Sequence, residues 1–216
     1  MDRTFWEQRW AAGRTAFHRP DPHPLLRRHL DRLGPPGRVY VPLCGKSVDM
    51  LLLRQHGHEV VGTEFVVEAV HQFFRELGAE PERREAPPFE SFAAPGITIL
   101  RGDAMAITRD HLGGAIDAVY DRGSLVAVDP ARRTELADSL RRVSRRQGRI
   151  LLVTLSYDQS KADGPPWSVD EATVRRLFAR HASIEILDEQ PDPGSPSLRD
   201  AGVSEFLERA YLIELT

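Results

Sequence analysis

The sequence has almost no cysteine, no long apolar run and no strong excess of either charge. Cys44 is the one cysteine among 216 residues, which excludes an internal disulfide and fits a reducing compartment. No apolar stretch approaches the roughly 20 residues that span a bilayer, and the polar N-terminus is unlike a signal peptide. The formal net charge of -3 gives no general attraction to nucleic acid or to an anionic membrane. We therefore expect a cytoplasmic protein that binds neither.

A metal site is not expected either. His18, His23 and His29 are spaced as in no helical or finger motif, and Cys44 stands alone. Hydrogen-bonding or solvated roles are therefore favoured for these histidines.

The chain does contain enough apolar residues for one core, with 41% hydrophobic residues. Strand-like and helical patterns alternate along it, which favours an α/β fold with a mostly parallel sheet between helices. A final pair of strands without a helix between them predicts an antiparallel strand at the end of the sheet. Strands are expected at 38–41, 59–64, 97–103, 116–121, 149–158, 183–189 and 208–215. Helices are expected at 4–13, 25–33, 47–57, 66–78, 130–148 and 170–181. The segments 80–96, 158–168 and 190–202 are expected to be loops.

The turn after the first of these strands, in VYVPLCGKSVDM, ends in Gly-Lys-Ser but lacks the glycines of a phosphate loop. The motif requires a glycine five residues before Gly45, where the sequence has Tyr40. The basic run RRVSRRQGR is read as the solvated face of the 130–148 helix, with nucleic-acid contact as the minor alternative. Nucleotide hydrolysis is therefore disfavoured.

The same turn has the position of an adenosine-binding turn. Glu64 ends the second strand 19 residues after Gly45, where a carboxylate would grip a ribose diol, and Asp103 ends the third. A turn with one glycine suits a ligand without a pyrophosphate, which favours S-adenosylmethionine (SAM) over NAD. A purely structural turn with a small buried Cys44 remains the alternative at this point.

Several segments together resemble the thiopurine S-methyltransferase family from about Phe5 to Tyr211. They occur in the order FWEQRW, AFH, VPLCGKSVDM, GHEVVGTE, YDRGSLVAV, LLVTLSYD and GPPWSV. The resemblance implies a Rossmann-like class I methyltransferase with a seven-stranded, mostly parallel sheet, helices on both faces and an N-terminal helical lid. It implies one domain, 1–216, with the lid in 1–34 and the core in 35–216.

The resemblance also implies SAM as cofactor, S-adenosylhomocysteine as product, and a monomer acting on a small-molecule acceptor. Family members methylate sulfur, and bacterial members often selenium or tellurium. The implied cofactor residues are Trp6, Trp10 and Phe17 in the lid, Leu43 and Gly45 in the turn, Glu64 at the ribose, Asp103 and Ala104 beside adenine, and Arg122. The implied acceptor residues are Phe17, Arg122 and Arg199, with Arg122 as the catalytic residue and Cys44 not a nucleophile. Phe65 departs from the aliphatic residue common in the family.

Two of these roles have structural alternatives. Trp6 and Trp10 share a helical face, and their rings either cover a sulfonium or only dock the helix. Arg122 either favours an anionic acceptor or forms a structural pair with Asp121. Methyl transfer is an in-line displacement that depends on alignment, and an ionised thiol needs no strong base. A nitrogen, oxygen or halide acceptor is the alternative reaction, and a non-catalytic SAM-binding protein is a further one.

Overall fold

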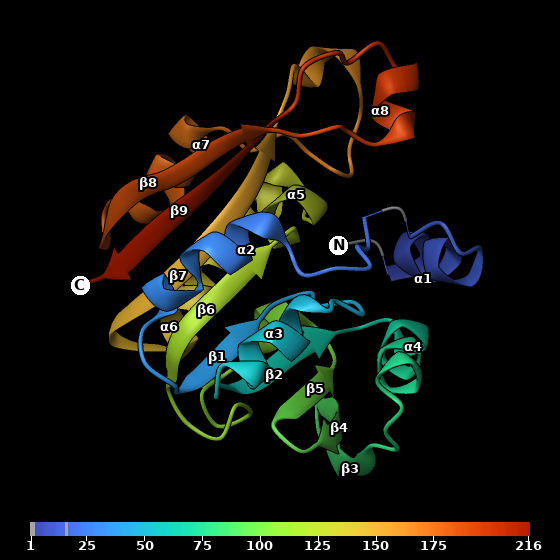
Figure 1. Ribbon diagram of the computed structural model, residues 1–216, viewed down its shortest axis with the longest axis vertical. Coiled ribbons are helices and arrows are strands. Elements are labelled where there is room, and N and C mark those ends of the chain that lie inside the picture. Colours follow the sequence, from blue (N-terminus) through green and yellow to red (C-terminus); the bar gives the residue numbers. More distant parts are fainter. Residues whose placement is uncertain (1–2, 16) are drawn as a thin grey trace.

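One central sheet organises the protein, whose computed structural model describes residues 3–15 and 17–216 (Figure 1). Within these residues the sheet has nine strands, in the order β3-β4-β5-β2-β1-β6-β7-β9-β8. The five strands β5, β2, β1, β6 and β7 are parallel, as the alternating pattern predicts. The strand bounds are β1 Arg38–Val41, β2 Glu59–Glu64, β3 Glu82–Ala86, β4 Phe89–Ala94, β5 Ile97–Arg101, β6 Ile116–Arg122, β7 Ser144–Ser156, β8 Ala182–Pro191 and β9 Leu207–Leu215.

The prediction of seven strands is wrong because residues 80–96 are not a loop. They form the hairpin β3–β4, which continues the sheet antiparallel to β5. Its prolines lie at the turn, and Phe89 and Phe92 of β4 are buried in clusters on opposite faces of the sheet. The outer strand β3 is rich in charge, which hides its strand pattern and suits an exposed sheet edge.

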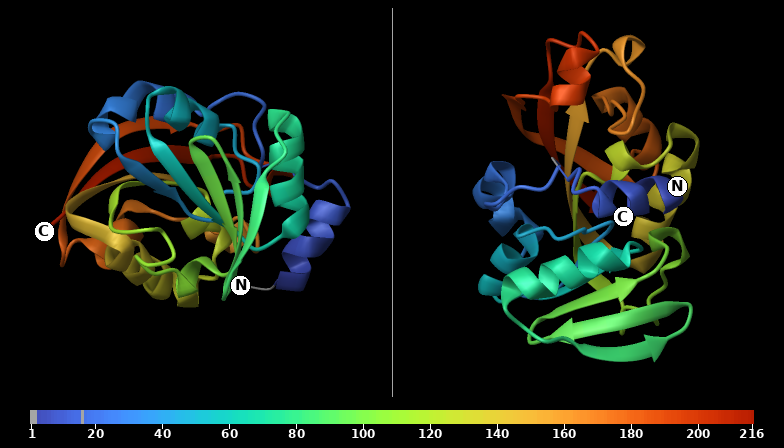
Figure 2. Two further views of the ribbon diagram at one scale, coloured as in Figure 1. Left: turned by 90° about the horizontal axis from the view of Figure 1, so that it is seen from below. Right: turned by 90° about the vertical axis from the view of Figure 1, so that its right-hand side faces the viewer.

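The last two strands do include an antiparallel one, as predicted, but that strand does not lie at the end of the sheet. β9 lies between β7 and β8 and is antiparallel to both, so β8 is the edge strand. The beginning of β9 therefore lies at the sheet edge where the parallel strands end. Figure 2 shows the sheet twisting between its helical layers.

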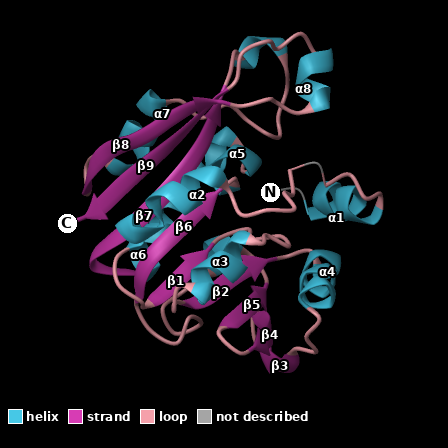
Figure 3. Cartoon of the chain, viewed as in Figure 1, coloured by secondary structure: helices cyan, strands magenta, loops and turns pink. Residues whose placement is uncertain are grey.

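Helices cover both faces of the sheet (Figure 3). Alternate residues of the central strands enter two buried clusters, as expected for strands covered on both sides. One cluster contains residues of α2 (Pro24–His29), η1 (Leu30–Leu33), α3 (Asp49–Gln55) and α4 (Val67–Leu77). The other contains residues of η2 (Ala104–Ala106), α5 (Ser124–Ala127), α6 (Arg133–Val143) and α7 (Glu171–Phe178). The remaining helices are α1 (Arg3–Ala11), η3 (Pro130–Arg132), η4 (Gln159–Lys161) and α8 (Pro196–Asp200).

Two helix predictions need correction. The helix expected over 130–148 ends at Val143, and Ser144 already pairs with Ile116 in the sheet. The basic run therefore crosses from α6 into β7 and is not one helical face. Several of its arginines make internal contacts, and Arg142, for example, donates to the carbonyl of Met105. The loop expected at 190–202 contains the short helix α8.

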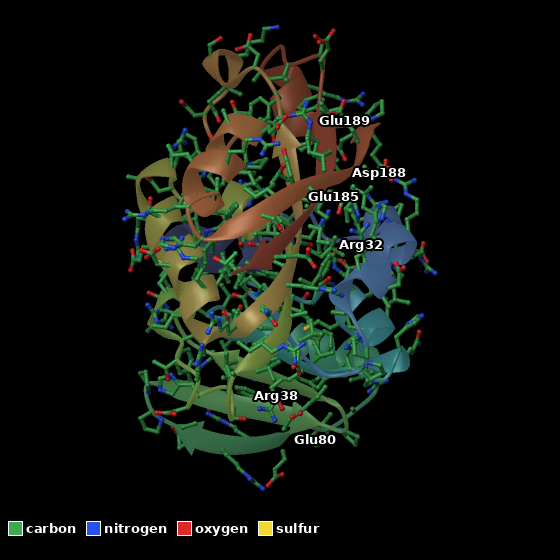
Figure 4. The ribbon with its side chains drawn as sticks, turned by 90° about the vertical axis from the view of Figure 1, so that its left-hand side faces the viewer. Arg32, Arg38, Glu80, Glu185, Asp188 and Glu189 are labelled. Atoms are coloured by element: carbon green, nitrogen blue, oxygen red, sulfur yellow. The ribbon has the colours of Figure 1, made fainter. Side chains whose placement is uncertain are left out.

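The N-terminal 34 residues divide between two places. α1 packs on α4, apart from the sheet, whereas Leu25 and Leu26 of α2 are fully buried in the core. Ion pairs tie this second part to the edge strand β8: Arg32 reaches Glu185 at 2.5 Å and His29 reaches the carboxylate of Asp188 at 3.1 Å (Figure 4). Across residues 3–15 and 17–216, none of the helices is both long and apolar enough to span a membrane.

Candidate functional site

A cavity of about 820 Å³ lies at the carboxyl ends of the parallel strands, bounded by residues of α1, the turn after β1, and the ends of β2, β6 and β7. Ligands of open α/β sheets bind at this edge. Pro165 and Pro166 of the GPP segment and residues 192–197 before and within α8 add a further wall. Of the three insertions, 158–168 and 190–202 thus line the cavity, whereas 80–96 does not.

The turn after β1 is held by backbone geometry and by close packing. Leu43 and Gly45 have φ values of 46° and 52°, and Cys44 N–H donates to the carbonyl of Thr63 at 2.9 Å. A Cβ on Gly62 of β2 would lie 2.6 Å from the sulfur of Cys44. The thiol is buried, and burial raises its pKa well above the ordinary value. Cys44 is therefore a packing residue here, not a reactive thiolate.

Glu64 is a buried carboxylate of the site, with 7% of its surface exposed. Its Oε2 accepts the Gly45 N–H at 3.0 Å and its Oε1 accepts the Val66 N–H at 2.8 Å. Burial raises the pKa of Glu64 to about 6, although these backbone bonds favour the ionised form. The Phe65 N–H also favours the ionised form. A carboxylate has about four acceptor sites, so at least one remains for a hydroxyl donor.

Three aromatic rings pack together beside the turn. Phe17 meets Trp6 and Trp10 edge to face, each at 5.7 Å between ring centroids. Trp10 is buried against Val66, and a Cβ on Gly45 would lie 3.3 Å from its ring. Phe17 is 38% exposed. All three rings line the cavity.

Arg122 ends β6 and lines the cavity. Its guanidinium donates to the backbone carbonyl of Phe17 at 3.0 Å. Asp121 instead points to the opposite side, where Ser124 N–H and Oγ donate to its carboxylate. The described bonds thus connect Arg122 to the aromatic segment and not to a structural pair with Asp121.

The remaining predicted site residues lie outside the cavity lining. Asp103 accepts the Met105 N–H at 2.9 Å as the cap of η2, and Ala104 is buried beside it. Arg199 lies on α8 and donates to the carbonyl of Pro193. The structure thus brings together the aromatic segment, the turn, Glu64 and Arg122, but neither the predicted adenine-side pair nor Arg199.

A buried polar network at the cavity was not predicted. The fully buried His23 donates its backbone N–H to Asp49 at 2.7 Å, and its Nε2 lies 3.1 Å from Glu208 Oε1. Tyr120 O–H donates to Asp49 at 2.9 Å. Asp49, Tyr120 and Glu208 line the cavity. An acidic residue at the beginning of an antiparallel strand is the sequence feature that could have indicated Glu208.

Solved structures with this fold include SAM-dependent methyltransferases. A Burkholderia thailandensis 1,6-didemethyltoxoflavin-N1-methyltransferase with bound S-adenosylhomocysteine matches with a TM-score of 0.65 and 16% identity, covering 99% of this chain and 87% of that one. A TehB-like SAM-dependent methyltransferase from Corynebacterium glutamicum matches with a TM-score of 0.57 and 16% identity, covering 98% and 97%. The chain therefore has the fold of the class I SAM-dependent methyltransferases.

Within that class the chain belongs to the thiopurine S-methyltransferase family. The family model for thiopurine S-methyltransferase matches residues 1–216. The thiopurine S-methyltransferase of Pseudomonas fluorescens strain Pf0-1 is 39% identical over 216 residues, which is 99% of each chain. That of Bordetella petrii is 43% identical over 190 residues, covering 87% of this chain and 86% of the relative.

Proposed function

We propose that this protein transfers the methyl group of SAM to the sulfur or selenium of a small aromatic or heterocyclic acceptor. The observation that carries the proposal is one cavity in which three aromatic rings, the Gly45 turn, Glu64 and Arg122 meet, in a chain of the thiopurine S-methyltransferase family. A small-molecule acceptor also agrees with a cavity of about 820 Å³.

The residues of the cavity fit the cofactor. Glu64 has an acceptor site left for a ribose hydroxyl, and a side chain at position 45 would press on the ring of Trp10, so glycine keeps this backbone accessible. We assign Leu43 and Gly45 to the methionine end, and Asp103 with Ala104 to the adenine side. Bound SAM supplies a methyl group on a sulfonium, and the faces of Trp6, Trp10 and Phe17 attract such a cation by about 0.5–2 kcal/mol.

The acceptor is assigned to the side of the cavity beyond Arg122. The guanidinium favours an anionic sulfur. Its bond to the Phe17 carbonyl couples the lid segment to the acceptor side, so closure and acceptor binding support each other. The contribution of these groups is alignment and exclusion of water, and we assign Arg199 to the acceptor side as well.

The lid is best limited to the residues before His23. We propose a single domain, 1–216, whose N-terminal lid ends before His23 and not at residue 34, the boundary that the family resemblance implies. Burial of Leu25 and Leu26 supports this earlier boundary, because a segment packed in the core cannot open without exposing the core to water. We further propose that the protein is a cytoplasmic monomer that acts on small molecules. Size-exclusion chromatography with light scattering tests the monomer.

Transfer of label from methyl-labelled SAM to thiophenol or 6-mercaptopurine tests the function, with the product identified by mass. An S-methylated product is the expected result. A product methylated on nitrogen or oxygen would favour the alternative acceptor class instead. Transfer of label to a halide ion, supplied in place of the thiols, would do the same. Cofactor binding without any product would contradict both.

A further inference from the structure

The acceptor side of the cavity contains a carboxylate that faces Arg122 from two strands away. Arg122 pairs with Val153 of β7, and Val153 pairs with Ala210 of β9. Side chains two residues apart on a strand share a face, so Glu208 lies on the same face as Ala210 and Arg122. Two strand spacings and two residues separate the backbones of Arg122 and Glu208 by about 12 Å. A flat ring can therefore lie between their side chains.

Two buried or half-buried side chains, His23 and Gln190, hold the Glu208 carboxylate in place. Its Oε1 is paired with His23 Nε2 at 3.1 Å and its Oε2 accepts from Gln190 at 3.0 Å. His23 Nδ1 accepts the Leu25 N–H, which leaves Nε2 as the ring nitrogen that donates to Glu208. Only two of about four acceptor sites of the carboxylate are occupied. The others are available to a ligand in the cavity that Glu208 lines.

Glu208 remains an acceptor despite its burial. Burial raises the pKa of this carboxyl, but the bonds from His23 and Gln190 and the charge of Arg122 outweigh it and leave the pKa below its ordinary value. An ionised carboxylate accepts hydrogen bonds and donates none. Both oxygens of Asp49, the neighbouring acid, already accept hydrogen bonds, from the His23 N–H and from the Tyr120 O–H.

We propose that Glu208 is the specificity-determining carboxylate of the acceptor site and accepts the ring N–H of heterocyclic thioamides. This inference rests on the proposed function. In neutral form such acceptors carry hydrogen on the ring nitrogen beside a C=S group. When the sulfur takes the methyl group, a C–S bond forms and the methyl–sulfonium bond breaks, with its electron pair kept by the departing S-adenosylhomocysteine. The ring nitrogen keeps its N–H electrons, and the proton passes to Glu208 and then to water.

Two acceptors distinguish recognition of the ring N–H by Glu208 from a general effect of Glu208 on the acceptor site. In 2-pyridinethione the N–H lies beside the sulfur, whereas thiophenol has no N–H. E208Q should lower kcat/KM for 2-pyridinethione by about 10- to 100-fold, since hydrogen bonds to charged groups are worth that much. The same variant should change the value for thiophenol by about threefold or less. The matched control is E189Q on the outer strand β8, where Glu189 pairs with Arg209 (Figure 4). It should change neither.

Binding provides a readout that does not depend on turnover. The affinity of each acceptor for the complex with S-adenosylhomocysteine is measured by calorimetry, with E208Q losing affinity for 2-pyridinethione only. Equal effects of E208Q on both acceptors, or none on either, would overturn the proposal. If wild-type protein methylates neither acceptor, the proposed function fails while binding still tests Glu208. If E208Q does not fold, wild-type protein should bind N-methyl-2-pyridinethione about tenfold more weakly than 2-pyridinethione; equal affinity would overturn the proposal.

Discussion

Replacement of Glu64 by glutamine should weaken binding of S-adenosylhomocysteine at neutral pH by roughly 10- to 100-fold. The change keeps the shape of the side chain but removes the charge that a ribose hydroxyl would meet, and bonds to charged groups contribute about 1.5–3 kcal/mol. It also turns an amide N–H toward either the Gly45 or the Val66 N–H, which now donates to Glu64. The turn itself should therefore be disturbed, which should weaken binding further.

The pH dependence of the dissociation constant for S-adenosylhomocysteine gives a second, independent test of Glu64. Burial raises the pKa of Glu64 to about 6, and hydroxyl donors favour the ionised form. Binding below that pH must then expel a proton, so the dissociation constant should be flat at alkaline pH and rise about tenfold per pH unit below 6. Asp121 also has a pKa raised to about 6 by burial, but its carboxylate faces Ser124. The Glu64 variant should lose this part of the pH dependence and keep any part due to Asp121.

Isothermal titration calorimetry between pH 5 and 8 measures both effects, over a range set by the carboxyl pKa of about 6. The matched control is E59Q at the other end of β2, where Glu59 pairs with Arg38 at the surface. That variant should bind S-adenosylhomocysteine as the unchanged protein does. An E64Q protein with unchanged affinity at pH 7.5 would refute the ribose assignment, and a wild-type affinity independent of pH would refute the role of the ionised form.

The other predictions concern the lid, the acceptor side and the turn. Arg122→Ala should lower acceptor turnover more than affinity for S-adenosylhomocysteine, and steady-state kinetics with calorimetry would refute an acceptor role if the losses are reversed. Trp10→Ala should weaken cofactor binding and lower the melting temperature, because a buried aromatic contributes about 3–5 kcal/mol, whereas Trp10→Phe should retain most of both; equal effects of the two variants would contradict a role for the ring. Gly62→Ala should lower the free energy of unfolding by about 1–3 kcal/mol, since its Cβ would lie 2.6 Å from the Cys44 sulfur. Adding Cys44→Ala should recover part of that loss in urea denaturation, and a neutral single variant would disprove the packing argument.

Local patterns were enough to predict the elements around the cofactor side of the site. β1 and β2 have the predicted bounds, and Glu64 ends β2 as expected, because short apolar runs bounded by glycine and polar residues indicate buried strands. The β3–β4 hairpin was missed since its prolines and its charged outer strand obscure the alternation. The end of α6 was misplaced because the helical pattern contains nothing that excludes Ser144 from the helix, and pairing with Ile116 decided it.

The sequence by itself therefore determined the α/β alternation, the turn and its carboxylate, and the family of the chain. Only the tertiary structure decided the opposite wall of the cavity. His23 and Glu208 are 185 positions apart, and they meet because β9 inserts antiparallel between β7 and β8, which brings its first residues to the ligand edge. Periodicity reports which way a side chain faces along its own element. Which elements become neighbours depends on how the whole set of apolar faces is buried, and no single segment contains that information.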